Sequence, residues 1–394
     1  MVVASKLEGH CTEQFSLLAR AFADNFSHCG EAGAACALYY RGQLVANLWG
    51  GTRDRHGQLP WQPSTLVNVF SAGKPIIACA VLQLAERGEL DLDAPIAELW
   101  PDFEQAGKAA VTTRMVLCHR AGLPLFQQEI PEKDIYSWNA MVLHLQKETP
   151  LWTPGARQGY QPFTFGWLLG EVVRRVSGKP IDRYIHGAIC QPFDIDVHWG
   201  LKPEQLDRVA DIQPVDPATV ASTSEGRAHS SKIRVSAWET EWRNRAFGSP
   251  ASLTYGTNSG NWRRAVIPAA NGHGSALGLA QFYRVLVNGG EWERRNMLSS
   301  KSLDLCVHQA SAEQDAILHA DMRFSLGFML SNDNSPVYMG PGKEAFGHAG
   351  AGGSLAFGDL KNELSFAYVT RFLGDSILGD RRAKNLVMAA YDCL

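Results

Sequence analysis

The alternation of apolar and polar positions predicts a helix near the start of the chain and two strands directly after it. Over residues 10 to 26, apolar side chains such as Phe15 and Phe22 recur at helical spacing. The next stretch, ACALYYRGQLVANLWGG, holds two runs of strand-forming residues on either side of Arg41 and Gly42. A tight hairpin needs a positive φ, which glycine supplies readily. We therefore expect the order helix, strand, strand.

The middle of the chain reads as helical, and strand-like segments return near its end. Apolar positions at helical spacing follow Ser71, and Gly88 is a suitable left-handed cap for that helix. Residues 76 to 270 are mainly helical in pattern, but residues 214 to 262 show little periodicity and are expected to form a loop. From Arg323 onward, RFSLGFMLS, AFGHAGAGGSLAFGD and ELSFAYVTRF are typical of successive antiparallel strands, and RRAKNLVMAAYDCL of a closing helix.

Strands at both ends of the chain predict a single sheet that both ends complete. We expect residues 1–75 and 271–394 to form an α/β domain, and residues 76–270 to form an inserted, mainly helical lobe. The predicted fold class is therefore α/β (α+β), with an antiparallel sheet flanked by helices. A crevice between two such parts is the usual place for a small-molecule site.

Composition argues against several classes of function. The net charge is −3, the pI is about 6.5 and basic residues do not cluster, so nucleic acid is not an expected partner. Glu8 and Glu13 interrupt the apolar residues that a secretion signal would need, and no run of about 18 apolar residues suits a membrane span. The eight cysteines form no C-x-x-C pair, so we expect mostly buried thiols in a cytoplasmic protein, although an even count leaves disulfides open.

The stretch VFSAGKP places Ser71 three residues before Lys74, at the predicted start of a helix. Residues three apart share a helix face, so the lysine amine can reach the serine hydroxyl. A serine needs such a base to become a nucleophile, and burial would lower the lysine pKa enough for it to serve. The competing interpretation is a serine N-cap beside a solvated lysine. No other serine of the chain has a lysine at this spacing.

Other catalytic motifs fit the sequence less well. The Gly-Lys pair before Pro75 lacks the spacing and the Ser or Thr of a phosphate-binding loop. No serine lies in a G-x-S-x-G elbow, which argues against an α/β-hydrolase. The twelve histidines form no H-E-x-x-H pair, so no metal site is expected. Most tryptophans are expected to pack in the core, while Trp152 or Phe126 is a candidate to line an acyl pocket.

Several blocks of the sequence, in this order, resemble the serine β-lactamase and penicillin-binding-protein superfamily. They are VFSAGKP, LAERGELDLDAPIAELWPDF, LCHRAGLP, PGARQGYQPFTFGWLLGEVVRRVSGKP and FGHAGAGGSLAFGD. The chain is most similar to one branch, the family VIII carboxylesterases and related β-lactamase-like serine hydrolases, over most of residues 30 to 370. The resemblance implies a β-lactamase/transpeptidase-like fold and a serine esterase that requires no cofactor.

The resemblance also implies roles for individual residues. Ser71 would be the acylated nucleophile, Lys74 its proton partner, and Tyr160 a tyrosine that shares base duty and passes a proton to the leaving group. A phenolate at Tyr160 would need the Lys74 ammonium beside it. The backbone N–H groups of Ser71 and Ala351 would form the oxyanion hole. His348 and Gly350 would border the substrate.

Two departures from the β-lactamase pattern favour a neutral ester as substrate. The second motif reads Tyr160-Gln161-Pro162, and a proline cannot hold a substrate amide as an asparagine does, unless Gln161 takes its place. His348 stands where many β-lactamases have a lysine, and it offers less positive charge for a β-lactam carboxylate. A β-lactamase or D-amino-acid peptidase remains an alternative, as does an inactive binding protein. The oligomeric state is left open.

Overall fold

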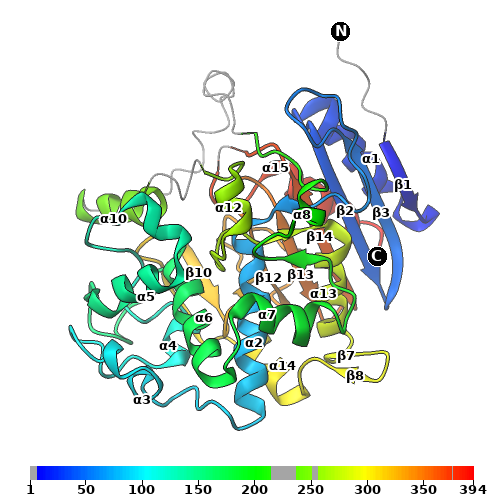
Figure 1. Ribbon diagram of the computed structural model, residues 1–394. Coiled ribbons are helices and arrows are strands. Elements are labelled where there is room, and N and C mark those ends of the chain that lie inside the picture. Colours follow the sequence, from blue (N-terminus) through cyan, green and yellow to red (C-terminus); the bar gives the residue numbers. More distant parts are fainter. Residues whose placement is uncertain (1–6, 214–236, 251–255, 375) are drawn as a thin grey trace.

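A nine-stranded antiparallel sheet, built from both ends of the chain, organises the described part of the molecule (Figure 1). The computed structural model describes residues 7–213, 237–250, 256–374 and 376–394. In spatial order the strands are β1 (Leu7–Cys11), β3 (Gln43–Gly51), β2 (Gly33–Tyr40), β14 (Leu364–Thr370), β13 (Leu355–Asp359), β12 (Ala345–Ala349), β11 (Met329–Leu330), β10 (Asp321–Phe324) and β9 (Ser311–Gln314). The early strand β2 pairs directly with the last strand, β14.

Smaller strand pairings and the helices complete the described elements. The short strands are β4 (Val67–Asn68), β6 (His273–Gly274) and β5 (Val197–His198) in one sheet, and β7 (Glu291–Trp292) with β8 (Arg295–Asn296) in another. The α-helices are α1 (Ser16–His28), α2 (Lys74–Glu86), α3 (Ile96–Leu99), α4 (Thr113–Leu117), α5 (Trp138–Lys147), α6 (Thr164–Ser177), α7 (Ile181–Ile185), α8 (Pro203–Leu206), α10 (Ala237–Gly248), α12 (Gly260–Arg264), α13 (Ala276–Val287), α14 (Ser300–Val307) and α15 (Arg381–Tyr391). The remaining turns of helix are η1 (Glu13–Phe15), η2 (Phe70–Gly73), η3 (Pro101–Phe103), η4 (Glu132–Tyr136) and η5 (His186–Cys190).

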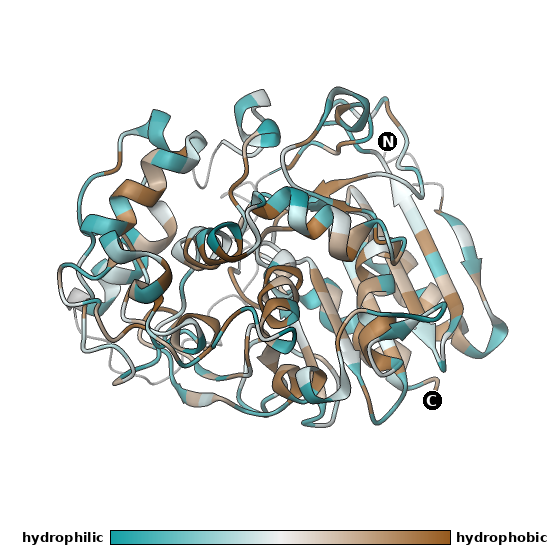
Figure 2. Ribbon diagram, turned by 60° about the horizontal axis from the view of Figure 1, so that its bottom comes forward, coloured by the Kyte–Doolittle hydropathy of each residue, from teal (hydrophilic) through white to brown (hydrophobic). Residues whose placement is uncertain are grey.

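Both faces of the sheet are covered, which follows from the alternation of side chains along each strand. In β2, Ala35 and Ala37 pack into the core that contains α13, whereas Cys36 and Leu38 pack into the core that contains α1 and α15. Successive side chains of a strand point to opposite faces, so apolar residues at every position indicate burial on both sides. Figure 2 shows that the helices at the centre of the molecule are coloured mainly as hydrophobic.

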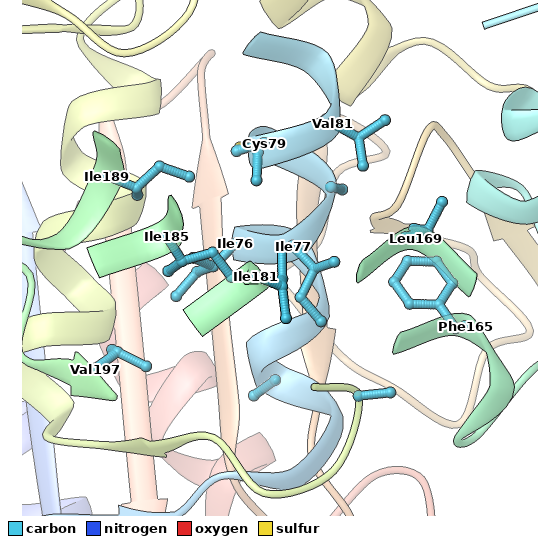
Figure 3. Close-up of a cluster of buried hydrophobic side chains, with 14 of the residues drawn as sticks. Ile76, Ile77, Cys79, Val81, Phe165, Leu169, Ile181, Ile185, Ile189 and Val197 are labelled. Carbon is cyan, nitrogen blue, oxygen red and sulfur yellow. The ribbon is translucent and has the colours of Figure 1, made fainter. Parts of the chain in front are cut away.

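Helix α2 lies at the centre of the larger core. Eleven of its thirteen residues, Lys74 through Leu84, are buried. In Figure 3, Phe165 and Leu169 of α6 lie on one side of α2, and Ile185 and Ile189 lie on the other. A helix that is apolar all round belongs in the interior, and its burial carries the lysine at its first turn into the interior with it.

The structure confirms several elements predicted from the sequence. The hairpin turn at Arg41 and Gly42 has positive φ at both residues, and α2 is followed by Gly88 in the left-handed conformation. The three strand-like segments after Arg323 all lie in the antiparallel sheet, although the first divides into the paired strands β10 and β11. Helix α15 closes the chain as expected. The division into two lobes at residues 75 and 270 stays a prediction.

Two predictions of local structure are partly wrong. The expected amphipathic opening helix is present as α1, but strand β1 precedes it and includes two of the residues expected to be helical. Its side chains are mostly exposed at the sheet edge, so they show no apolar alternation. Part of the loop expected over residues 214–262 is helix, namely α10 and α12. Residues 249–250 and 256–259 are loop as expected, and residues 214–236 and 251–255 lie outside the described residues.

Two further expectations concerned membrane-spanning helices and the state of the cysteines. No helix in the described ranges is long and apolar enough to cross a bilayer. All eight cysteines fall within those ranges and are free thiols, and five of them are buried, as most were expected to be.

A buried ionic cluster ties the closing helix to the sheet. The Arg382 guanidinium on α15 donates to the Glu31 carboxylate at 3.1 Å and to the carbonyl oxygens of Gly352 and Phe372 at 3.1 and 2.8 Å. Glu31 also accepts a hydrogen bond from the Tyr368 hydroxyl. Both charged side chains are almost fully buried, and Arg382, which also pairs with Asp380 at 2.9 Å, is the cation that compensates Glu31.

We predict that Arg382→Met lowers the free energy of unfolding by about 3–5 kcal/mol, because Glu31 would remain as an unpaired buried charge. Lys384→Met, an exposed change on the same helix, is the matched control and should stay within about 0.5 kcal/mol of the parent. Urea unfolding followed by circular dichroism measures both. Equal stability of the two variants would contradict the assigned role of the cluster.

Candidate active site

Ser71 lies in η2, the tight helical turn that leads into α2. The preceding residue, Phe70, has a φ of 49°, a left-handed conformation that non-glycine residues rarely adopt. This local strain turns the chain sharply from β4 into the helix. The turn leaves Phe70 and Ser71 partly accessible, while the residues that follow in α2 are buried.

The Lys74 amine lies beside Ser71 and has two further partners. Its Nζ is 2.8 Å from Ser71 Oγ, 2.9 Å from the carbonyl oxygen of Pro162 and 3.3 Å from the carbonyl oxygen of Ala269. Carbonyl oxygens only accept hydrogen bonds. A neutral amine would therefore give its two protons to the two carbonyls and direct its lone pair at the serine hydroxyl.

Burial favours this neutral form of Lys74. The side chain is fully buried, and the loss of solvation holds its pKa well below the ordinary value of 10.5. No carboxylate among the described residues forms an ion pair with Lys74 that would restore the charge. The contacts and the pKa shift thus agree on an amine able to accept a proton from Ser71.

Tyr160 brings a phenol to the same place. The Lys74 Nζ is 4.9 Å from the centre of the Tyr160 ring. Burial raises the pKa of Tyr160 above its usual value, and the nearby Ser71 hydroxyl offsets only part of this rise. The shifts of both groups therefore oppose the phenolate and ammonium pair expected from the sequence, and favour a neutral phenol beside a neutral amine.

The end of β12 forms another wall of the site. Gly350 lies so close to the chain before Ser71 that a Cβ on it would be 2.2 Å from the carbonyl oxygen of Val69. Only a residue without a side chain fits this close approach, and it brings the next residue, Ala351, toward Ser71. Neither the N–H of Ser71 nor that of Ala351 donates to an acceptor in the described part of the chain. Both are therefore available to a substrate oxygen, as an oxyanion hole requires.

His348 on β12 is a neutral imidazole that donates a hydrogen bond through Nδ1. Its Nδ1 is 2.7 Å from the carbonyl oxygen of Ala349, and this contact requires the proton on Nδ1. The buried Nε2 has no partner within the described residues. Burial, assisted by Lys74, lowers the pKa of His348 to about 3. The imidazole therefore carries no charge near neutral pH.

The pocket roles expected for three other residues stay predictions, and the structure gives the surroundings of each. Gln161 Nε2 lies within 3.5 Å of the Leu123 carbonyl and the Thr164 hydroxyl. Phe126 packs in the core, with its ring 6.1 Å from that of Trp167. Trp152 is half-buried against Gly159, next to Tyr160, and its indole donates to the Arg157 carbonyl.

The sequence analysis missed several residues that surround Tyr160. The His119 ring is 4.8 Å from the Tyr160 ring, and its Nδ1 accepts the Gln161 N–H. Phe247 of α10 is stacked on the Tyr160 ring, with the two ring centres 6.3 Å apart. Asp315 accepts the Tyr160 N–H. His119 lies within a block quoted for the family resemblance, but Asp315 and Phe247 belong to no motif that could have revealed them.

Two surface cavities lie away from Ser71, Lys74 and Tyr160. A surface cavity of about 510 Å³ lies between Tyr338 and Tyr391, and one of about 350 Å³ lies between Leu151 and Trp242. Neither is lined by Ser71, Lys74 or Tyr160, and we place the chemistry where those three side chains meet. Within the described ranges, no three His, Cys, Asp or Glu side chains gather as metal ligands.

Comparison with known proteins agrees with this geometry. A sequence profile of the family described as Beta-lactamase matches residues 19–388. The Esterase/beta-lactamase LipL of Mycobacterium tuberculosis is 32% identical over 94% of this chain and 85% of its own length. The crystal structure of a family VIII carboxylesterase superimposes with a TM-score of 0.88 at 32% identity, covering 99% of this chain and 100% of its own. A penicillin-binding protein homologue from Caulobacter crescentus gives 0.87 at 34% identity, with the same coverage. The predicted fold class is confirmed.

The buried amine should leave a signature in the pH dependence of stability. Its pKa is lower in the folded than in the unfolded chain, so unfolding takes up a proton between the folded-state pKa and 10.5. The free energy of unfolding then rises with pH there, by up to about 1.4 kcal/mol per pH unit. Lys74→Met should lack this contribution. Urea unfolding of both proteins at several alkaline pH values tests it, and identical slopes would contradict a depressed pKa.

Proposed function

This chain belongs to the beta-lactamase family and is a serine hydrolase of that superfamily, and from that premise we propose that it cleaves short-chain carboxylic esters. The observation that carries the proposal is the buried Lys74 amine held 2.8 Å from the Ser71 hydroxyl. A neutral base at hydrogen-bond distance from a serine is the requirement for nucleophilic acyl transfer.

In the proposed reaction, Ser71 Oγ attacks the ester carbonyl carbon while its proton passes to the Lys74 amine. The carbonyl oxygen becomes an oxyanion, which accepts hydrogen bonds from the N–H groups of Ser71 and Ala351. As the tetrahedral intermediate collapses, the ester C–O bond breaks and the alcohol leaves with a proton from the Tyr160 phenol. The Lys74 ammonium can return its proton to Tyr160, which lies beside it.

Deacylation then repeats these steps with water as the nucleophile. Water attacks the acyl-enzyme carbonyl and gives one proton to the Lys74 amine, the bond to Ser71 Oγ breaks as Oγ takes that proton from Lys74, and the carboxylic acid is released. Each residue ends in its starting protonation state, so the cycle requires no cofactor. The same group can act as base in one half and acid in the other, as microscopic reversibility requires.

The charge of the site favours a neutral ester over an anionic β-lactam. His348 is uncharged near neutral pH, and burial also disfavours the charged form of Lys74. Neither group offers a fixed cation for a carboxylate. The proline at position 162 contributes only a carbonyl oxygen, which Lys74 already occupies. The relatives named as an esterase and as a carboxylesterase support the same choice.

A β-lactamase is the second candidate function. It is favoured by the relative named Esterase/beta-lactamase, and acyl transfer to Ser71 would open a lactam ring by the same steps. We expect this activity to be weaker than ester hydrolysis because the site lacks the fixed positive charge. Parallel assays with 4-nitrophenyl butyrate and nitrocefin distinguish the two candidates.

We predict that Ser71→Ala abolishes turnover of ethyl butyrate, and that Lys74→Ala or Tyr160→Phe lowers kcat/KM for this alkyl ester by roughly 10²-fold or more, the scale of general acid–base catalysis. A fluorophosphonate probe should label the parent enzyme covalently at Ser71, as intact-protein and peptide mass spectrometry would detect. The Ser71→Ala variant should remain folded but unlabelled. Near-normal turnover by any of the three variants would contradict the assigned role.

We further predict that His348→Lys shifts preference toward anionic substrates. A charged hydrogen bond contributes about 1.5–3 kcal/mol, so the ratio of kcat/KM for 4-nitrophenyl hemisuccinate to that for 4-nitrophenyl butyrate should rise about 10- to 100-fold. His348→Gln, which adds no charge, is the control and should leave this ratio within about threefold. No change in the ratio for the lysine variant would show that this position does not contact the acyl group.

A further inference from the structure

Asp315, directly after β9, holds the main chain of Tyr160. Both of its carboxylate oxygens accept the Tyr160 N–H, at 3.0 and 2.9 Å. Its Oδ1 also accepts the N–H groups of Ile317 and Leu318, each at 2.9 Å, and its Oδ2 accepts from Gln158 Nε2 at 3.2 Å. The residue is 1% exposed. Four donors thus converge on one buried carboxylate.

A second acidic residue, which lies within β9 itself, also binds the segment before Tyr160. Glu313, two positions earlier, accepts the Gln158 N–H at 3.1 Å and pairs with the Arg120 guanidinium. The Ala316 N–H donates to the Gln158 carbonyl at 3.2 Å. Residues two apart on an extended chain point the same way, so the end of β9 clamps the segment that carries Tyr160.

The carboxylate of Asp315 is compensated by hydrogen bonds rather than by a cation. No ion pair with Asp315 occurs among the described residues, and burial raises its pKa although the four donors oppose the rise. The other titratable groups around Tyr160 are Lys74, His119 and His348, and burial disfavours the charged form of each. Asp315 is a carboxylate in direct contact with Tyr160, through the Tyr160 N–H. Its charge also raises the pKa of Tyr160.

We propose that Asp315 is a positioning residue that keeps Tyr160 placed and protonated as the proton donor to the leaving alcohol. A purely structural role would be to shape the turn after β9, which the bonds to Ile317 and Leu318 already do. The two contacts with Tyr160 go beyond that turn. The inference rests on the proposed esterase function, because only there does Tyr160 deliver a proton.

The leaving group separates a positioning role from a structural one. Ethanol leaves as a strongly basic alkoxide unless it is protonated, whereas 4-nitrophenolate leaves readily without a proton near neutral pH. A loss of proton donation therefore slows ethyl butyrate far more than 4-nitrophenyl butyrate. General damage to the site would slow both. The value of kcat/KM is the correct measure because it reports only the steps up to acylation.

Asp315→Asn is the most informative variant, because it keeps the size of the side chain. The asparagine oxygen can still accept main-chain N–H groups. Its new amide would meet Gln158, whose Oε1 is buried without a partner among the described residues and could accept from it after the glutamine amide turns over. Folding should therefore survive the change. Asp359→Asn on β13, another buried carboxylate, whose hydrogen bonds go to Asn362 and Tyr391, is the matched control.

We expect Asp315→Asn to lower kcat/KM for ethyl butyrate at least about tenfold while that for 4-nitrophenyl butyrate changes less than about threefold, a partial loss of the general-acid contribution. Tyr160→Phe should show the same selectivity, and adding Asp315→Asn to it should cause little further loss, since the two changes remove one function. The Asp359→Asn control should not change the ratio of the two substrates.

The possible outcomes are distinct. Equal losses on both esters, or no loss on either, would overturn the positioning role while leaving the proposed function intact. Full additivity with Tyr160→Phe would also overturn it. If the parent enzyme hydrolyses neither ester and no fluorophosphonate labels Ser71, the proposed function fails and this inference fails with it. If Asp315→Asn does not fold, Gln158→Leu, which removes one donor to Asp315, tests the same selectivity.

Discussion

The burial of one amine is the constraint on which the site depends. Helix α2 passes through the middle of the core and takes its first turn out of water, and this burial lowers the pKa of Lys74 beside Ser71, as the proposed function requires. The two carbonyl oxygens of Pro162 and Ala269 come from distant segments, and each must reach the same nitrogen. At Gly166 an added Cβ would lie 2.3 Å from the main-chain nitrogen of Ala269, so the packing of α6 against that segment is part of the arrangement.

The site is polar but short of hydrogen bonds. The Nε2 of His348 and the Oε1 of Gln161 are buried without partners in the described part of the chain. Such groups cost free energy in a folded protein and concentrate where ligands bind. The left-handed backbone at Phe70 adds local strain beside the nucleophile. The compensation lies elsewhere, in the packed cores on both faces of the sheet and in the ionic cluster of Glu31 and Arg382.

The sequence predicts the features that depend on neighbouring positions or on a recognised motif. The spacing of Ser71 and Lys74 and the hairpin at Arg41 are local patterns. The motif around Tyr160 was identified through the resemblance to a known family. Strand β1 escaped prediction because its exposed residues form an edge that is defined only by pairing with β3. Helix α10 has no apolar stripe that periodicity could detect. Asp315 stands in an ordinary polar stretch, and only tertiary contact brings it to Tyr160.

The pairing of β2 with β14 has a consequence for biosynthesis. Ala37 of β2 lies opposite Ala367 of β14, so the sheet cannot close around β2 until β14 has left the ribosome. Ser71 emerges early, but β12, which ends at Ala349 just before Gly350 and Ala351, emerges late. A nascent chain therefore carries Ser71 before the residues that surround it are in place, and under the proposed function the site is completed only when β12 and β14 have been added.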